Sequence, residues 1–170
     1  MQQMPVSNAG IVQVVPADYA NPAHAAALVE LLDAYARDPM GGGHGLSDFA
    51  RANLVPALAV RPQAFSVLAY VGAQAVGLVN CIEGFSTFAC KPLVNVHDVV
   101  VIGSHRGQRV GEHMLALVEQ IARARGACKL TLEVLHGNAP AHKLYRRVGF
   151  ANYQLDPAMG QAEFLQKWLD

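Results

Sequence analysis

A chain of 170 residues with 52% hydrophobic and 15% charged residues is large enough for one domain over residues 1–170 and too apolar for a disordered chain. Thirteen basic residues balance thirteen acidic ones, which argues against a dedicated binder of nucleic acid or of acidic membranes. The first ten residues have no basic segment followed by an apolar run, and no uncharged stretch approaches the roughly 18 apolar residues of a membrane span. We therefore expect a cytoplasmic protein with no nucleic-acid or membrane partner.

The first half of the chain predicts a strand, two helices and an antiparallel pair of strands. Asn21-Pro22 and Ser47 are typical first residues of helices, and the stretch between the helices, Asp38–Gly45, contains four glycines and must be a loop. Pro56 predicts a kink or a break within the second helix. The expected elements are Ile11–Val15, Pro22–Arg37, 48–60, Ala64–Val71 and Gln74–Glu83.

The second half alternates strands and helices. Phe85–Pro92 is expected to be an irregular link, and Gly126 ends the long helix that begins near Arg109. A strand, a helix and a further strand over residues 94–135 require a parallel crossover, whereas the earlier hairpin is antiparallel. The expected fold is therefore mixed α/β, with a mixed, mostly antiparallel sheet and helices on both faces. The remaining expected elements are the strands Val94–Ile102, Lys129–Leu135, Gly149–Leu155 and Glu163–Leu169, and the helices 109–125 and 138–147.

The charge is unevenly distributed. Residues 1–100 contain seven acidic and four basic residues, and residues 101–170 contain nine basic and six acidic ones. This predicts a cation-binding half and an anion-binding half, although a chance imbalance in so short a chain is equally consistent. Cys81, Cys90 and Cys128 lack the spacing of a metal site or a disulfide framework, and we expect no metal.

The segment VVVIGSHRGQRVGE, residues 99–112, predicts a strand, a glycine-containing turn and the start of a helix. The free N–H groups of a first helical turn bind anions, and glycine allows a phosphate to approach the backbone. The pattern is neither a P-loop nor a dinucleotide-binding turn. Taken alone, it is equally consistent with an ordinary tight turn.

About 25 residues later a second pattern follows, L-T-L-E-V-x-x-x-N-x-x-A-x-x-L-Y-x-x-x-G-F. Together with the R-G-x-x-V-G turn, it resembles the GNAT superfamily of N-acetyltransferases over residues 94–155, and the first 60 residues match only in element order. The residues that form the second pattern are Leu130, Leu132, Val134, Asn138, Ala141, Leu144, Tyr145, Gly149 and Phe150.

The resemblance implies an enzyme that binds acetyl-CoA between the two strands of residues 94–102 and 129–135. The pyrophosphate would lie on the turn, the pantetheine arm along Val99 and Val101 and against Asn138, and Tyr145 would protonate the departing thiolate as general acid. The cofactor-binding residues so implied are Val99, Val101, Arg106, Gly107, Gln108, Arg109, Val110, Gly111, Glu112, Asn138 and Tyr145.

One residue departs from the family pattern: Arg109 stands where the family has a glycine. A positive φ at this position would strain the loop by about 1–3 kcal/mol. We expect instead that Arg109 opens the helix in ordinary geometry. Its guanidinium then either supplements the phosphate site or is simply solvated.

Acetyl transfer also needs a neutral amine, so a base must take the proton of the acceptor. Glu83, His97 and Asp98 are the predicted acceptor-binding residues, and Asp98 is also the catalytic candidate. His105 and His113 are expected to be bystanders.

The F-S-T-F and H-D-V-V-V segments resemble those of the diamine and thialysine acetyltransferases, with His97 in place of an acidic residue. The resemblance implies a small cationic amine substrate and a homodimer. It also implies that Met40–Gly45 is an acceptor-side loop, either a flexible lid or a plain connector. Two other functions are consistent with the sequence: a non-catalytic acyl-CoA-binding domain, and acetylation of protein N-termini or lysines.

Overall fold

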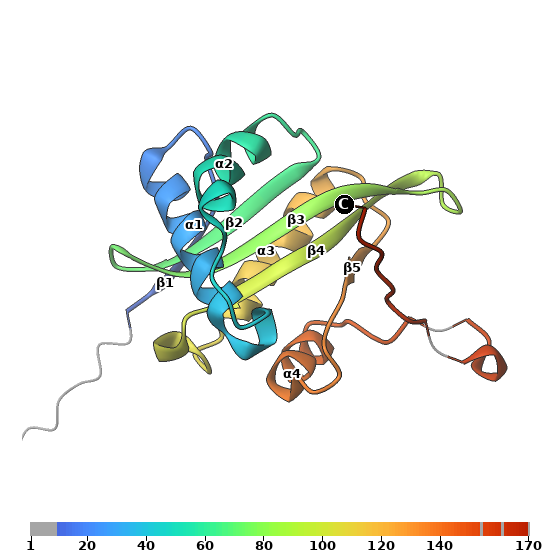
Figure 1. Ribbon diagram of the computed structural model, residues 1–170. Helices are drawn as coiled ribbons and strands as arrows, with labels where there is room; N and C mark the ends of the chain where they lie inside the picture. Colours follow the sequence, from blue (N-terminus) through green and yellow to red (C-terminus); the bar gives the residue numbers. More distant parts are fainter. Residues whose placement is uncertain (1–9, 154, 161, 170) are drawn as a thin grey trace, which may run out of the picture. The chain divides into compact units, whose positions relative to one another are not determined.

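The computed structural model describes residues 10–153, 155–160 and 162–169 (Figure 1). The chain falls into two compact units, Met1–Leu132 and Glu133–Asp170. The single domain that the length predicts therefore stays a prediction. None of the helices in the described ranges is long and apolar enough to span a bilayer.

The first unit is built on one five-stranded sheet with the order β1-β2-β3-β4-β5. Neighbouring strands are antiparallel except for β4 and β5, which are parallel, so the predicted mixed, mostly antiparallel sheet is confirmed. The strands are β1 (Val12–Pro16), β2 (Ala64–Val71), β3 (Gln74–Ser86), β4 (Lys91–Val101) and β5 (Leu130–Leu132).

Helices cover both faces of this sheet (Figure 1). Helices α1 (Pro22–Arg37) and α2 (Asp48–Ala59) pack on one face, where Leu78 of β3 belongs to their apolar cluster. Successive strand residues point to opposite faces, and at the adjacent Gly77 an added Cβ would lie 2.8 Å from the Met114 side chain of α3 (Val110–Ala124). Helix α3 therefore packs closely on the other face, where Gly77 leaves it room.

Both predicted caps of the first two helices are present. The side chain of Asn21 accepts hydrogen bonds at the start of α1, and Ser47 Oγ accepts one from the Ala50 N–H at the start of α2. The predicted break at Pro56 is wrong, because α2 continues to Ala59. Its neighbour Val55 is buried in the cluster with α1, and this packing outweighs the one lost hydrogen bond.

The link predicted over Phe85–Pro92 is wrong, since β3 and β4 continue pairing to Ser86 and Lys91. Pro92 is tolerated inside β4 because of the side to which its backbone points. Its carbonyl accepts from the Cys128 N–H at 2.8 Å, on the edge away from β3, so the missing N–H of Pro92 is not needed by the β3 ladder.

The strands predicted for the C-terminal part of the chain are also wrong. The strand predicted over Lys129–Leu135 pairs only over Leu130–Leu132, and the second unit contains helix α4 (Ala139–Arg147). The described residues of Gly149–Leu155 and of Glu163–Leu169 form no strand, and residue 154 lies outside the described residues. Apolar residues alone do not make a strand, because a strand needs a partner edge to complete its hydrogen bonds.

Asp33 joins α1, α2 and the loop between them. Its Oδ2 lies 2.9 Å from Arg37 Nε and 2.8 Å from Arg51 Nη1, and its Oδ1 accepts the Leu46 N–H at 2.8 Å. The hydrogen bonds from Arg37 and then Arg51 lower the pKa of Asp33 to about 2. The loop of residues 38–47 is therefore anchored at its C-terminal end.

We expect Asp33→Asn to destabilise the protein at pH 7 by replacing the carboxylate between two guanidinium groups. The pKa of Asp33 is lower in the folded state than in the unfolded state, so its contribution is complete above about pH 4 and is lost as pH falls toward 2. Urea unfolding of both proteins at pH 7, 4 and 3 measures this difference. A gap between the two that stays constant down to pH 3 would contradict the assignment.

Candidate functional site

A β-bulge in β4 defines the site. Asn80 of β3 faces Asp98, whereas the next residue, Cys81, faces Val96, so His97 is an extra residue in β4. Asp98 therefore lies on the same face of the sheet as Asn80, the face covered by α1. Asn95 faces Ile82, which lies on the same face of β3 as Asn80, and His97 Nδ1 lies 3.2 Å from Asn95 Oδ1. The two predicted residues, His97 and Asp98, therefore lie on one face.

Just beyond the bulge, the outer edge of β4 is open. The parallel pairing with β5 covers only Val94–Val96 of β4. The Ile102 N–H donates to Val76 O at 3.0 Å, so the alternation of an antiparallel ladder turns the backbone groups of Val99 and Val101 away from β3. An extended ligand can therefore pair with these groups as a strand would.

The turn that follows β4 has the geometry of an anion site. Gly107 has a φ of 78°, and a side chain added there would meet nothing within 4 Å. Helix α3 begins at Val110 with no side-chain cap, so the N–H groups of its first turn are directed at the turn. Val110 and Gly111 are themselves buried, and only their backbone can contribute to binding.

The expectation for Arg109 is wrong: it has a φ of 62° and the left-handed conformation. Glycine adopts such a backbone without steric cost, whereas Arg109, with its Cβ, adopts it under strain. Its Nη2 lies 2.8 Å from Glu112 Oε2 in the first turn of α3, and its side chain is 71% exposed. Arg109 therefore compensates a carboxylate that would repel a bound phosphate.

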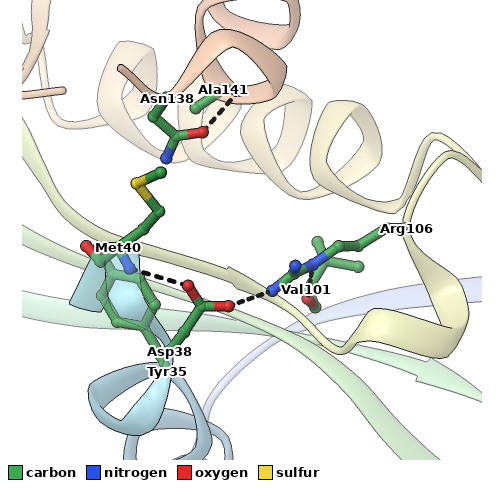
Figure 2. A network of polar contacts seen from close by, with 7 residues as sticks. All are labelled: Tyr35, Asp38, Met40, Val101, Arg106, Asn138 and Ala141. Carbon is green, nitrogen blue, oxygen red and sulfur yellow. Dashed lines mark hydrogen bonds and ion pairs between the residues drawn. The ribbon is translucent and has the colours of Figure 1, made fainter. Parts of the chain in front are cut away.

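Arg106 connects the turn to the opposite loop (Figure 2). Its Nε donates to Val101 O and its Nη2 to Asp38 Oδ2, both at 3.0 Å. Val101 O belongs to the open edge of β4, and Asp38 follows directly after α1. Arg106, which is predicted to bind the phosphate of acetyl-CoA, is thus hydrogen-bonded to the loop that is predicted to lie on the side of the acceptor amine.

The loop after α1 is well anchored. Asp38 Oδ1 accepts the Met40 N–H at 2.9 Å and so starts a 3₁₀ turn, Pro39–Gly41. A Cβ at Gly41 would lie 2.0 Å from Tyr35 O, so this glycine serves close packing against the end of α1. Asp38 and Arg106 hold one end of the loop and Asp33 holds the other, and the role of Met40–Gly45 stays a prediction.

Negative charge gathers near Asp98. Burial, then the charges of Asp98 and Asp38, raise the pKa of Tyr35. The Met40 N–H and Arg106 lower the pKa of Asp38. Asp38 is thus neutralised by Arg106, whereas no cationic side chain of the described residues lies within ion-pair distance of Asp98.

Glu83 is not brought to this group. Its Oε2 lies 3.1 Å from Nη1 of Arg125, the C-cap residue of α3. The Arg125 guanidinium is in turn stacked 4.5 Å from the centre of the Phe65 ring. Glu83 therefore lies on the α3 face of the sheet, opposite to Asp98. His105 contacts Ser104, and Gln108 Nε2 donates to Ser104 O, so these two side chains bond within the turn.

In the second unit, Asn138 and Tyr145 belong to α4. Asn138 Oδ1 accepts the Ala141 N–H at 3.2 Å, the predicted cap (Figure 2). At the other end, Gly149 has a φ of 96°, its N–H donates to Arg146 O, and the Phe150 N–H donates to Tyr145 O. This is a Schellman motif, in which the Phe150 ring packs edge-on against Tyr145 at 5.9 Å.

A model of the acetyltransferase (GNAT) family matches residues 26–150, well over half of the chain. The chain belongs to this family. Solved structures share its fold. A probable acetyltransferase superposes with a TM-score of 0.77 at 22% identity, covering 93% of this chain and 99% of that one.

Two curated relatives are similar over shorter stretches. Streptothricin acetyltransferase of Streptomyces lavendulae is 39% identical over 90 residues, 51% of this chain and 48% of the relative. Aminoalkylphosphonate N-acetyltransferase of Salmonella typhimurium is 29% identical over 83 residues, 49% of this chain and 54% of the relative. This GNAT chain thus matches about half of the length of these relatives.

An aminoglycoside N-acetyltransferase in complex with CoA, AAC(6′)-Iy, superposes with a TM-score of 0.72 at 17% identity, covering 96% of this chain and 99% of that one. At this identity the likeness shows the fold alone. Among the described residues, no group of three metal-ligating side chains is found.

Sequence reasoning does not single out three polar residues that the structure brings near Asp98 or Arg106. Asp38 lies in the glycine-rich loop of the sequence, and Ser66 and Asn80 lie within apolar strand segments. The signal for the last two is a polar residue inside an otherwise apolar run, in AFSVLAYV and VGLVNCI. Buried polar residues of this kind are informative because each needs a partner.

We expect Arg109→Gly to be more stable than Arg109→Ala by about 1 kcal/mol, because only glycine adopts the left-handed conformation without steric cost. Both variants lose the same ion pair with Glu112, so the comparison isolates the backbone. Chemical denaturation of the two variants measures the difference. Equal stabilities would show that the backbone at residue 109 is not strained.

Proposed function

We propose that this protein transfers the acetyl group of acetyl-CoA to a primary amine of a small cationic molecule. Family membership supports the acetyl transfer. The observation that carries the choice of acceptor is Asp98: a half-buried carboxylate, without a cationic partner among the described residues, beside the open edge of β4. A cation completes the charge balance at such a carboxylate.

The residues of the first unit fit acetyl-CoA. The backbone of Val99 and the N–H of Val101 offer pairing groups to the amides of a pantetheine arm, whereas the Val101 carbonyl already accepts a hydrogen bond from Arg106. The first turn of α3 offers N–H groups to a pyrophosphate, and the bare Gly107 lets it approach. Acetyl-CoA supplies the activated acetyl group, and the chain holds it in place.

On the acceptor side, Asp98 would bind the ammonium group and then accept its proton, directly or through water. An alkylamine has a pKa near 10.4 and is protonated at pH 7, so it must lose a proton before its nitrogen attacks. The new C–N bond forms as the C–S bond breaks. His97, on the same face as Asp98, would line the acceptor site.

The leaving thiolate also needs a proton. A free thiol has a pKa of about 8.5, so expelling the thiolate at pH 7 is uphill by about 2 kcal/mol. We assign the proton donor to Tyr145 of α4, whose ring is held by Phe150 and by the Schellman motif. Asn138 would hold the pantetheine arm.

The names of the relatives narrow the search for the acceptor. One relative is named as an acetyltransferase of streptothricin and another as an acetyltransferase of aminoalkylphosphonates. One structural neighbour is an aminoglycoside acetyltransferase in complex with sisomicin. These molecules are small amines. A homodimer and a cytoplasmic location are part of the same proposal.

The deciding experiment is a screen for acetyl-CoA-dependent release of free thiol. The panel contains streptothricin, sisomicin, spermidine, thialysine and aminomethylphosphonate, together with a lysine-containing peptide and a peptide with a free alanine N-terminus. Turnover of a small cationic amine at least tenfold faster than of either peptide supports the proposal. Preference for a peptide assigns the protein to protein acetylation. If none of the panel members causes release of free thiol, the proposed enzymatic activity is overturned.

We expect acetyl-CoA to stabilise the folded protein by about 2.7 kcal/mol at 100 times its dissociation constant. Thermal unfolding with acetyl-CoA and with dephospho-CoA measures the effect, and the second ligand should give a smaller shift. Arg109→Ala should weaken binding several-fold. Arg123→Ala, which also breaks an exposed Arg–Glu pair on α3, is the matched control. A Tm that does not change with millimolar acetyl-CoA would exclude the cofactor site.

Tyr145→Phe should lower kcat by about 100-fold and leave acetyl-CoA affinity nearly unchanged, because it keeps the ring and removes only the hydroxyl. Tyr153→Phe, in the same unit, is the control and should keep full activity. The measurement is single-turnover acetylation of the best amine of the panel. Wild-type rates for Tyr145→Phe would show that its ring only packs.

A further inference from the structure

Three polar residues form a row across the middle of the sheet. Ser66 of β2, Asn80 of β3 and Asp98 of β4 occupy directly opposite positions on three neighbouring strands. Ser66 Oγ donates to Asn80 Oδ1 at 2.6 Å, and Asn80 Nδ2 donates to Asp98 Oδ2 at 3.0 Å. Tyr19, in the link between β1 and α1, lies 2.9 Å from Ser66 through its hydroxyl group. We call these four residues the polar row.

The polar row borders the apolar core under α1. Two residues further along the same strands, the same face carries Leu68, Leu78 and Val100, all in the core. Ser66 and Asn80 are only 1% and 6% exposed. Leaving an amide or a hydroxyl unpaired at such positions costs about 1–3 kcal/mol, so the row is stable only while each member keeps its partner.

The hydrogen bonds of the row run in one direction. The single proton of the Ser66 hydroxyl is used toward Asn80, so the Tyr19 hydroxyl must be the donor to Ser66. The bond from Ser66 occupies the carbonyl oxygen of Asn80 and thereby turns its NH₂ group toward Asp98. Bonds arranged head to tail in this way strengthen each other. All of them end on the carboxylate.

The bulge at His97 makes this arrangement possible. If the same residues of β4 paired one to one with β3, His97 would face Asn80, and Asp98 would face Val79 and point to the α3 face. The bulge and the row thus act on the same side chain: one selects its face and the other its orientation.

We propose that Tyr19, Ser66 and Asn80 are positioning residues that hold Asp98 as an oriented carboxylate for the acceptor amine. The inference deepens the proposed function and rests on its assignment of Asp98. The row orients the carboxylate and does not conduct its proton. The Asn80 amide donates hydrogen bonds through its NH₂ group and accepts them at its oxygen, but it does not pass a proton from one to the other. The proton from the amine therefore leaves Asp98 by another route.

The first test needs no acceptor. In ¹⁵N-labelled protein, NMR measures the exchange rate of the Asn80 side-chain NH₂ protons with solvent. Ser66→Ala removes the bond that fixes the Asn80 carbonyl oxygen, so the amide loses its orientation toward Asp98 and its NH₂ exchange should accelerate about tenfold. Asp98→Asn should shift the NH₂ resonances. Ser66→Thr, which keeps the hydroxyl, should retain the slow exchange. Unchanged exchange and shifts in Ser66→Ala would overturn the row.

The second test uses the panel amine that the wild-type enzyme acetylates fastest. Ser66→Ala should lower kcat about tenfold, with acetyl-CoA affinity unchanged and with activity recovered in Ser66→Thr. The matched control is Tyr70→Phe, which removes a hydroxyl from the same apolar cluster and should keep wild-type kcat. Thermal unfolding confirms that each variant is folded.

The two tests separate two kinds of failure. If Ser66→Ala unfolds at a lower temperature but keeps its kcat, the row is structural only and the proposal is wrong. If the wild-type enzyme acetylates no panel member, the proposed function fails, and the NMR experiment still decides whether the row orients Asp98.

Discussion

The arrangement of the site depends on one irregularity in the β3–β4 ladder, the extra residue at His97. The bulge shifts the register of everything that follows in β4 by one residue. It brings Asp98 to the α1 face, opposite Asn80, and it directs the backbone groups of Val99 and Val101 to the outer edge. Since β5 pairs with only three residues of β4, that edge begins where the parallel pairing ends. The proposed acceptor carboxylate, Asp98, is therefore followed directly in the same strand by the edge proposed to bind the cofactor.

Among the described residues, the ion pairs around this strand leave Asp98 without a cationic partner. Arg106 compensates Asp38, Arg109 compensates Glu112, and Arg125 compensates Glu83 on the opposite face. Asp98 has instead the neutral amide of Asn80. A neutral donor orients a carboxylate without cancelling its charge, which is the state that a cationic amine requires. The Arg106 contacts add a direct connection between the cofactor turn and the acceptor-side loop, through one guanidinium group.

In the second unit, the same residues that identify the family have a plain geometric reason. The spacing Y-x-x-x-G-F places a glycine at the first position after the helix where φ must be positive, and an apolar residue after it that packs back on the tyrosine. Tyr145 is thereby held by its own helix end. Asn138 at the opposite end is a helix cap, which explains its place before Ala139-Pro140 independently of any ligand.

The sequence by itself determined what depends on neighbours along the chain. The caps Asn21, Ser47 and Asn138, the glycine after α3, the hairpin and the turn before α3 are local, and their residues specify them. Only the tertiary structure decided what depends on partners far away in the chain. The C-terminal apolar runs form no strand among the described residues, and Pro92 stays inside β4 because its backbone faces away from β3. Ser66, Asn80 and Asp98 meet for the same reason: strand register, set by packing of whole strands and by one bulge, determines which distant residues face each other.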